Sequence, residues 1–386
     1  MDLSLTEEQQ LLRDTIRDIC DRYSLPADVR ALEDDPVGYR PDLWSELAGL
    51  GVLGLTVPEE LGGSGLSAPE LAIVYEELGR ALCATPHLVT SVVGSGLLVR
   101  AGTEEQRNEW LPGVVEGGIV LTCAWPEPGR GWTARGVQAR ATRTDGGFEV
   151  TGTKVLVPFA SVARGIVTLV RTGDEDEDLA LLLVRPDTDG VRRTQVPTLG
   201  SDASFLVELD GVRVPDGDVI GAAGEGWRLW SEALVDAHVA IAAFAVGGAA
   251  RAHELAVDYA KERVQFDRPI GSFQGVAHPL AETAMEVEGA RVLVYEAAWA
   301  RASGAPLGPL AAMAKLYACD VFRRTTKVAH QVFGGIGFTR DIDIQLYFRR
   351  AKQLEITWEG PRELEDRIAA AELDGDRPFV TIDGER

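Results

Sequence analysis

The spacing of the apolar residues changes twice along the 386-residue chain, and these changes constrain the fold more than any other feature. Up to about residue 115, apolar side chains recur at the spacing of amphipathic helices. Between about residues 119 and 220, short apolar runs alternate with turn residues, which is typical of antiparallel strands. From residue 226 onward, long helical stretches return. This order predicts an α+β protein with an N-terminal helical domain, a small β-barrel or sandwich, and a C-terminal helical bundle.

Local signals refine this prediction. Thr6 and Gln9 have the spacing of a capping box at the start of a helix. In the middle zone, Asp145-Gly146-Gly147 and Asp210-Gly211 are typical of hairpin turns and loops. The expected strands are 119–124, 137–142, 148–157, 166–170, 179–184 and 205–209. The expected domains are residues 1–117, 118–222 and 223–374, with a polar tail at 375–386.

The net charge of −22 argues against a nucleic-acid binder and against docking on an anionic membrane. Cys20, Cys83, Cys123 and Cys319 form no closely spaced pair along the chain, so neither a zinc cluster nor a redox dithiol is indicated. The N-terminal residues lack the apolar core of a signal peptide, and no uncharged run is long enough for a membrane span. We therefore expect a soluble cytoplasmic protein that binds no metal.

Two segments carry the most specific information about function. The first is residues 259–274, YAKERVQFDRPIGSFQ, and the second is residues 331–338, QVFGGIGF, followed by YFRRAK at 347–352. At these residues the chain closely resembles the acyl-CoA dehydrogenase family of flavoproteins. The resemblance extends over nearly the whole chain and includes the glycine-rich loop at 61–66 and Thr151-Gly-Thr-Lys154.

The resemblance implies that FAD is the cofactor. The residues that match cofactor contacts in these two segments are Arg263, Phe266, Gln274, Gln331, Gly334 and Gly335. Arg263 matches the arginine that meets the FAD pyrophosphate, and the two glycines let the backbone approach a phosphate. In the family these residues reach the FAD of a neighbouring subunit, so the resemblance also implies a homodimer, homotetramer or hetero-oligomer. The alternative interpretation is a solvated arginine and a glycine helix cap.

The middle domain departs from the family pattern on the flavin side. Family members carry a Thr-Glu-Pro segment against the flavin, where this chain has Trp125 and Pro126 before Glu127. A second family threonine, which hydrogen-bonds near the reactive flavin nitrogen, is replaced by Pro158. Trp125, Pro126 and Pro158 are therefore expected near the flavin, but proline provides neither a hydroxyl nor an N–H group.

The resemblance assigns the catalytic base to Glu359, in the segment Trp358-Glu359-Gly360-Pro361. Pro361 replaces the usual threonine, and the spacing from the preceding arginine motif is one residue longer than in the common pattern. We expect the apolar residues around Glu359 to raise its pKa by desolvation.

Some relatives place the base on the long helix of the third domain, where this chain has Ala237. His238 takes the place of a neighbouring arginine, and Asp236 is a candidate for a displaced base. His238 and Trp358 are expected on the substrate side of the site, while Glu359 alternatively is a solvent-facing loop carboxylate.

Taken with the resemblance, the leading hypothesis is FAD-dependent α,β-dehydrogenation of an acyl thioester carried by CoA or a carrier protein, with electrons passed to an electron-transfer flavoprotein. One alternative is a catalytically silent subunit that completes a neighbour's FAD site in a hetero-oligomer. Another is an enzyme recruited to a specialised pathway with a non-standard substrate. The two prolines and His238 favour the alternatives, whereas the presence of Glu359 favours an active enzyme.

Overall fold

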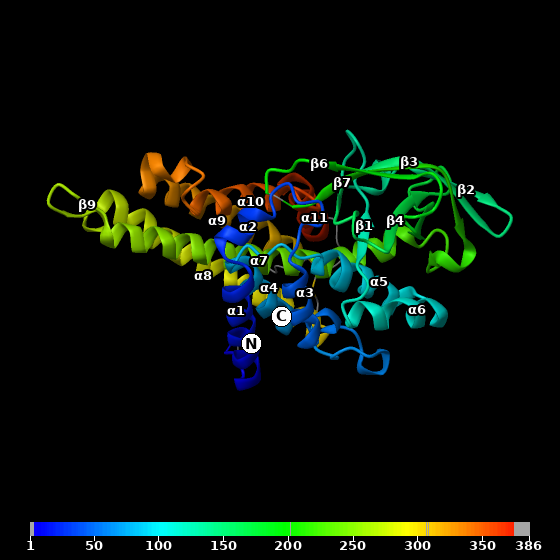
Figure 1. Cartoon of the computed structure of the whole chain (residues 1–386), viewed down its shortest axis with the longest axis horizontal. Coiled ribbons are helices and arrows are strands. Elements are labelled where there is room, and N and C mark those ends of the chain that lie inside the picture. Colours follow the sequence, from blue (N-terminus) through cyan, green and yellow to red (C-terminus); the bar gives the residue numbers. More distant parts are fainter. Residues whose placement is uncertain (1–3, 201, 306, 308, 374–386) are drawn as a thin grey trace. The chain divides into compact units, whose positions relative to one another are not determined.

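The structure is a computed structural model that describes residues 4–200, 202–305, 307 and 309–373 (Figure 1). The predicted order of a helical, a β and a second helical region is confirmed. Among the described residues, six α-helices come first: α1 (Glu7–Tyr23), α2 (Pro26–Ala31), α3 (Pro41–Gly49), α4 (Ala68–Arg80), α5 (Ser95–Ala101) and α6 (Glu104–Val115). The strands are β1 (Leu121–Ala124), β2 (Arg140–Thr144), β3 (Gly147–Pro158), β4 (Gly165–Arg171), β5 (Leu179–Val184), β6 (Val191–Val196), β7 (Ser204–Pro215) and β8 (Val219–Ile220). The last helices are α7 (Gly226–Glu262), α8 (Gln274–Ser303), α9 (Leu310–Phe333), α10 (Ile344–Ile356) and α11 (Pro361–Leu373), with a short β9–β10 hairpin (Val264–Gln265 and Arg268–Pro269) between α7 and α8.

The chain forms two compact units. The helical unit comprises Met1–Val29, Ala68–Cys83 and His238–Arg386, and the sheet unit comprises Arg30–Ser67 and Ala84–Ala237. The boundary falls within α7, which begins in the sheet unit and continues into the helical unit. The domain boundaries at residues 117, 222 and 374 stay a prediction, and the expected tail at 375–386 lies outside the described residues.

The sheet unit is built on one mixed sheet. Its strand order is β6-β7-β3-β2-β4-β5-β8, and β1 pairs with β4 in parallel. All residues of β4 and β5 are buried, so these strands form the core of the unit. The expected hairpin at Asp145-Gly146 joins β2 to β3, where Thr144 pairs with Gly147.

The expectation of a loop at Asp210-Gly211 was wrong. Both residues lie inside β7, where the register between Val150 and Gly152 of β3 shifts. Gly211 has a φ of 64°, and its N–H donates to the Thr151 hydroxyl at 3.2 Å. The Asp-Gly pair therefore forms a β-bulge, because glycine takes up the left-handed conformation that the extra residue needs.

The helical unit begins as predicted. The Thr6 side chain accepts from the backbone of Gln9, and the Gln9 side chain accepts from the N–H of Thr6, so the capping box is confirmed. Within the unit α4 packs very closely on α7. A β-carbon on Gly79 would lie 2.0 Å from the carbonyl oxygen of Phe244, and one on Gly247 would lie 1.8 Å from that of Glu76. The two helices therefore touch backbone to backbone.

Helix α7 is long and apolar enough to cross a membrane by length and composition alone. However, 83% of its most apolar window is buried inside the structure. A helix that is apolar on all sides is usual in the core of a large protein. The alanines along this helix permit the close packing of its neighbours, since they add little volume at the contacts.

The four cysteines are all buried and free. Although Cys20 and Cys83 are 63 positions apart in the sequence, their sulfur atoms lie 3.5 Å apart between α1 and the end of α4. Within residues 4–200, 202–305, 307 and 309–373, no group of three or more His, Cys, Asp or Glu side chains is arranged to hold a metal ion.

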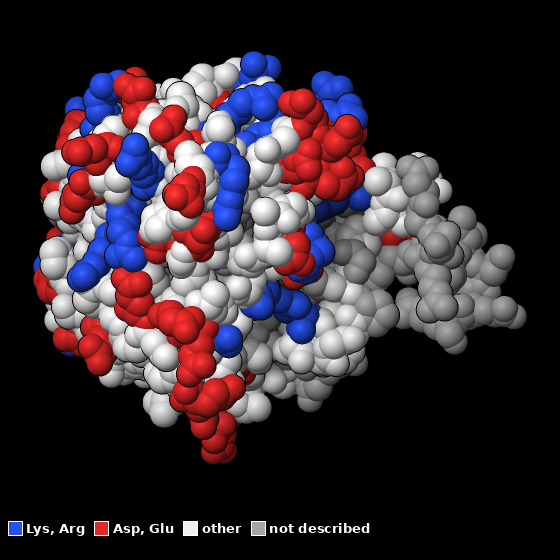
Figure 2. Space-filling model, turned by 90° about the vertical axis from the view of Figure 1, so that its right-hand side faces the viewer, with Lys and Arg blue, Asp and Glu red and all other residues white. Residues whose placement is uncertain are grey.

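The surface of the sheet unit carries charges of both signs. Figure 2 shows one face of the molecule, on which acidic and basic side chains lie among each other. The ion pairs of this unit include Arg135–Asp176, Arg140–Asp174, Arg143–Asp216 and Arg192–Glu208. Such exposed pairs stabilise a fold only slightly, so we expect them to contribute mainly to solubility.

Candidate active site

Glu359 lies in a short connection between α10 and α11, and the backbone there has an uncommon conformation. Trp358 has a φ of 47° and Glu359 a φ of 77°. These left-handed values are costly for residues other than glycine, because the β-carbon crowds the backbone. Both side chains are nevertheless buried, with Trp358 3% and Glu359 3% exposed. The Glu359 carboxylate is therefore not a solvent-facing loop group, contrary to the alternative interpretation of the sequence.

Two buried basic side chains hold the carbonyl groups of this connection. Lys315 on α9 donates from Nζ to the carbonyl oxygen of Glu359 at 2.5 Å. His238 on α7 places Nε2 3.3 Å from the carbonyl oxygen of Trp358, so this nitrogen carries the proton and donates. The costly backbone conformation is thus supported by hydrogen bonds from two neighbouring helices.

The two oxygens of the Glu359 carboxylate have different surroundings. Arg367 on α11 donates from Nη2 to Oε1. His238 Nε2 lies 3.2 Å from Oε2, but Oε2 accepts no hydrogen bond of ordinary geometry from the described part of the chain. One oxygen is therefore held in place, while the other is buried and able to accept a proton.

The expected rise in the pKa of Glu359 was wrong. Burial raises the pKa of the carboxyl group, but His238 and Arg367 favour its charged form and together outweigh burial, so the pKa lies below its usual value. Burial also lowers the pKa of His238 below its usual value, and the nearby Lys315 adds to this effect. At neutral pH the site therefore contains an ionised carboxylate beside a neutral imidazole.

Sequence reasoning missed Lys315 and Arg367. Lys315 is fully buried, and desolvation lowers the pKa of its ammonium group. The available signal was a lysine within the apolar stripe of α9, because a lone charge at such a position needs a buried partner. Arg367 gave no comparable signal, since it lies among the charged residues of α11.

The alternative base Asp236 lies in the sheet unit, where it forms an ion pair with Arg100. Ala237 beside it is buried and carries no carboxyl group. Ala237, at the position where the resemblance places the base of some relatives, thus cannot accept a proton. The neighbouring Asp236 is paired with Arg100.

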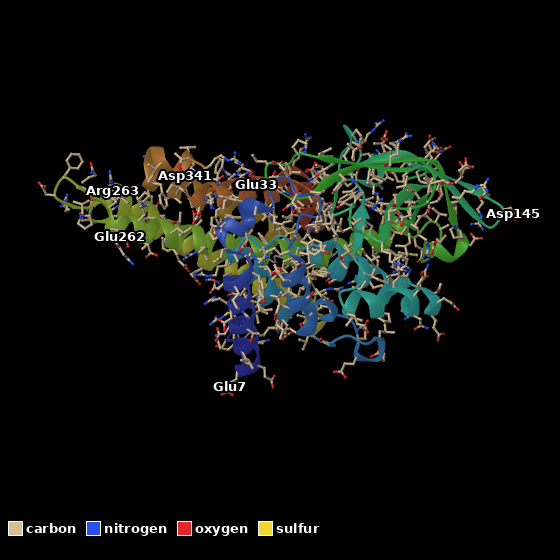
Figure 3. The ribbon with its side chains drawn as sticks, in the orientation of Figure 1. Glu7, Glu33, Asp145, Glu262, Arg263 and Asp341 are labelled. Atoms are coloured by element: carbon tan, nitrogen blue, oxygen red, sulfur yellow. The ribbon has the colours of Figure 1, made fainter. Side chains whose placement is uncertain are left out.

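Arg263 and Phe266 lie at the end of the helical unit where α7 meets the β9–β10 hairpin. Figure 3 shows Arg263 beside Glu262 at this end of α7. Arg263 is exposed, and Phe266, which has a φ of 53°, is 85% exposed. Gln274 begins α8 and is also exposed. An exposed phenylalanine in a costly conformation indicates a contact surface rather than a core position.

The segment at 331–338, the second one predicted to contact the cofactor, lies next to the segment at 259–274. The rings of Tyr259 on α7 and Phe333 on α9 stack at 4.4 Å between centroids, one turn before Arg263 and directly before Gly334. Gln331, Gly334 and Gly335 are exposed, Gly334 has a φ of 65°, and no atom lies within 4 Å of a β-carbon built on either glycine. This open backbone beside an exposed guanidinium fits a dinucleotide phosphate.

In the sheet unit, Trp125, Pro126 and Pro158 belong to neighbouring segments. The N–H of Val155 donates to the carbonyl of Pro126 at 2.9 Å, and the Thr122 hydroxyl donates to the carbonyl of Pro158. Trp125 is buried against Trp132 and Trp230, with ring centroids 5.0 and 5.4 Å away. The structure therefore brings these three residues together within the sheet unit, while their role toward a flavin stays a prediction.

A buried ion pair between Lys154 and Glu127 is hydrogen-bonded to the backbone of the Trp125 segment. Lys154, which is fully buried, donates to Glu127 Oε1 at 2.7 Å, to the carbonyl of Leu169 at 2.6 Å, and to that of Trp125 at 3.2 Å. Glu127 also accepts backbone N–H groups from Gln138 and Ala139. Because both charges are fully hydrogen-bonded, the pair holds this segment in one conformation.

The chain matches one protein family along nearly its whole length. Residues 6–118, 122–212 and 224–373 match the N-terminal, middle and C-terminal domains of acyl-CoA dehydrogenase, respectively. A Bacillus subtilis (strain 168) protein named "Probable acyl-CoA dehydrogenase YngJ" is 33% identical over 383 residues, which cover 97% of this chain and 100% of the relative.

Solved structures give the same result. The ChsE4-ChsE5 complex from Mycobacterium tuberculosis contains a chain that is 31% identical, with a TM-score of 0.88 and coverage of 98% of this chain and 100% of that one. Butyryl-CoA dehydrogenase from Megasphaera elsdenii is 28% identical, with a TM-score of 0.88 and coverage of 95% and 98%. The resemblance and the predicted fold class are confirmed: the chain belongs to the acyl-CoA dehydrogenase family.

Proposed function

We propose that this chain is an FAD-dependent acyl-CoA dehydrogenase in which Glu359 takes the α-proton of the acyl thioester. Glu359 Oε2 takes the proton of the α C–H bond. FAD, when bound, would supply the acceptor for the β-hydride and its two electrons, so that a carbon–carbon double bond forms between the two carbons. An electron-transfer flavoprotein is the proposed next acceptor of these electrons.

The state of Glu359 is the observation that carries this proposal. A base needs a carboxylate that is ionised, shielded from water and open at one oxygen. Glu359 meets these conditions, since its pKa is lowered, its side chain is 3% exposed, and Arg367 occupies only Oε1. Burial lowers the pKa of His238, so the imidazole beside the carboxylate is neutral.

Arg263 and the Gln331–Gly335 segment are the proposed contacts to the FAD phosphates, as the open backbone and exposed guanidinium support. The family pattern assigns these contacts to the FAD of a neighbouring subunit. We therefore also propose that the chain assembles with a second copy or with a related subunit.

The test of the base is Glu359→Gln, which preserves the shape of the side chain and removes its proton acceptor. We expect anaerobic flavin reduction by an acyl-CoA to slow by about 10²–10⁴-fold, because that is the usual effect of losing a general base. Flavin content should not change. Glu365→Gln on the exposed face of α11 is the matched control and should reduce its flavin at the wild-type rate.

A wild-type rate in Glu359→Gln would exclude Glu359 as the base and make Asp236 the next candidate. The acyl-CoA used should span short, medium and long chains, since the chain-length preference is not specified by the residues around Glu359. If none of these acyl-CoA substrates reduces the flavin of the wild-type protein, the result supports a second candidate function, which is described next.

The second candidate is a subunit that completes a partner's FAD site and has no working site itself. Pro126 and Pro158 favour it, because proline lacks an N–H group and the carbonyls of both already accept hydrogen bonds from Val155 and Thr122. The similarity to a chain of the ChsE4-ChsE5 complex is compatible with a partner of related sequence.

The visible spectrum of the chain expressed alone distinguishes the two candidates. Flavin absorption that survives gel filtration supports an enzyme with its own cofactor site. A colourless chain that becomes yellow only when it is co-expressed with a related subunit supports the partner role.

A further inference from the structure

The connection between α10 and α11 is held mainly through its backbone. Thr357 N–H donates to the carbonyls of Gln353 and Leu354, and Gly360 N–H donates to the Glu363 carboxylate at 3.1 Å. Between these two fixed points Trp358 and Glu359 take left-handed conformations. Such a conformation turns the carbonyl of Glu359 toward the interior, where an unbonded carbonyl is costly.

Lys315 meets this carbonyl from a place where a lysine is unusual. Its side chain is 0% exposed, and it lies on α9 among buried alanines, Ala311, Ala312, Ala314 and Ala318. Its ammonium group donates to the Glu359 carbonyl at 2.5 Å. A methionine or leucine would fill the same space without the cost of burying a charge. The lysine must therefore provide something that an apolar side chain does not.

We propose that Lys315 is a positioning residue that keeps the Glu359 backbone in its left-handed conformation and so aims carboxylate oxygen Oε2 at the substrate. This inference rests on the proposed function of Glu359 as the base. Lys315 acts on the carbonyl of Glu359 and Arg367 acts on Oε1, whereas the nearest polar group to Oε2 is the neutral His238 imidazole, with Nε2 3.2 Å away. In this arrangement cations hold the backbone carbonyl and Oε1, and no cation is paired with Oε2, the oxygen proposed to take the proton.

Charged and titratable groups from α7, α9, α11 and the connection between α10 and α11 lie around Lys315. They are Cys319 on α9, Glu359 in the connection, Glu363 on α11 and His238 on α7. Burial lowers the pKa of the lysine, while the acidic groups oppose this change.

The test uses three variants of the flavin-loaded protein. Lys315→Met has a similar length but no donor, and Lys315→Gln keeps a donor with a shorter reach and no charge. Lys327→Met, on the exposed face of the same helix, is the control and should match wild type. For flavin reduction by acyl-CoA we expect kcat to fall at least tenfold in Lys315→Met, with an intermediate value in Lys315→Gln. KM and flavin content should not change.

Hydrogen–deuterium exchange provides a readout that does not depend on activity. In flavin-free protein, the peptide that spans residues 355–362 should exchange faster in Lys315→Met than in wild type, whereas peptides from α8 should not change. If Lys315→Met does not fold, Lys315→Gln carries both measurements. A variant with the wild-type kcat and wild-type exchange at residues 355–362 overturns the inference, and so does a uniform increase in exchange over the helical unit.

Comparing Glu359→Gln with Lys315→Met distinguishes a failure of this inference from a failure of the proposed function. If Glu359→Gln reduces flavin at the wild-type rate, Glu359 is not the base and the premise is lost. If Glu359→Gln is slow while Lys315→Met is as fast as wild type, the base stands and only the positioning role is wrong.

Discussion

The pKa of the buried Glu359 carboxyl group is set by side chains on other helices rather than by its immediate neighbours in the sequence. The apolar neighbours in the sequence predicted a raised pKa, but Arg367 on the next helix and His238 on α7 lower it. The identity of the candidate base could be read from the segment around it, because the residue type and the family pattern are local. Its pKa could not be predicted, because the two side chains that lower it, His238 and Arg367, lie on two other helices.

The lowered pKa of Glu359 leads to a prediction about pH. The acid limb of kcat/KM should lie below the usual glutamate pKa of about 4.3, since the free enzyme keeps its base ionised. Arg367→Met should move this limb to higher pH, because the cation that favours the carboxylate is lost. The measurement is kcat/KM for flavin reduction in both proteins, from the lowest pH at which they stay folded up to pH 8, and an unmoved limb would contradict the assignment.

The interactions of the Glu359 carboxylate with Arg367 and His238 also make the free energy of unfolding depend on pH. Because the folded pKa is below the unfolded one, the pair stabilises the fold above the unfolded pKa, and this contribution is lost as the pH falls through the folded value. His238 acts in the same direction, since burial lowers its pKa and its protonation below about pH 6.5 opposes folding. The helical unit should therefore lose stability on acidification.

At the scale of elements, regular patterns were predictable and context-dependent ones were not. The hairpin at Asp145 and the long helix α7 follow from turn residues and from an unbroken apolar stretch. Strand β6 (Val191–Val196) was missed because its central residues are polar and half of the strand is exposed, so it looks like a loop. Helix α10 was not predicted, because its buried face includes an arginine, Arg350, which interrupts the apolar spacing.

The contact between α4 and α7 predicts the effect of adding one methyl group. Gly79→Ala and Gly247→Ala should each destabilise the fold by about 1–3 kcal/mol, because the new β-carbon would meet a backbone carbonyl that cannot move aside. Gly289→Ala in α8 is the control, since its β-carbon would make ordinary contacts at 3.7 Å or more. The control should be neutral or slightly stabilising. Urea unfolding measures all three, and equal midpoints would contradict the close approach.

At the scale of the whole molecule, the exposed segments around Arg263 and Gly334 are the proposed contacts to the FAD of a second subunit. Arg263→Ala should release FAD, since a charge-assisted hydrogen bond contributes about 1.5–3 kcal/mol. The measurement is flavin per chain after gel filtration, with Arg301→Ala near the end of α8 as an exposed control. Equal flavin in wild type and Arg263→Ala would rule out this contact, and a monomer that retains its flavin would rule out the shared site.

The close approach of α4 and α7 also has a consequence for volume. Pressure shifts a folding equilibrium according to the internal voids that unfolding eliminates. Where Gly79 and Gly247 let two backbones touch, no space remains for even one more carbon atom. The contact between these two helices therefore contains little void volume for unfolding to eliminate, and hydrostatic pressure should do little to separate them.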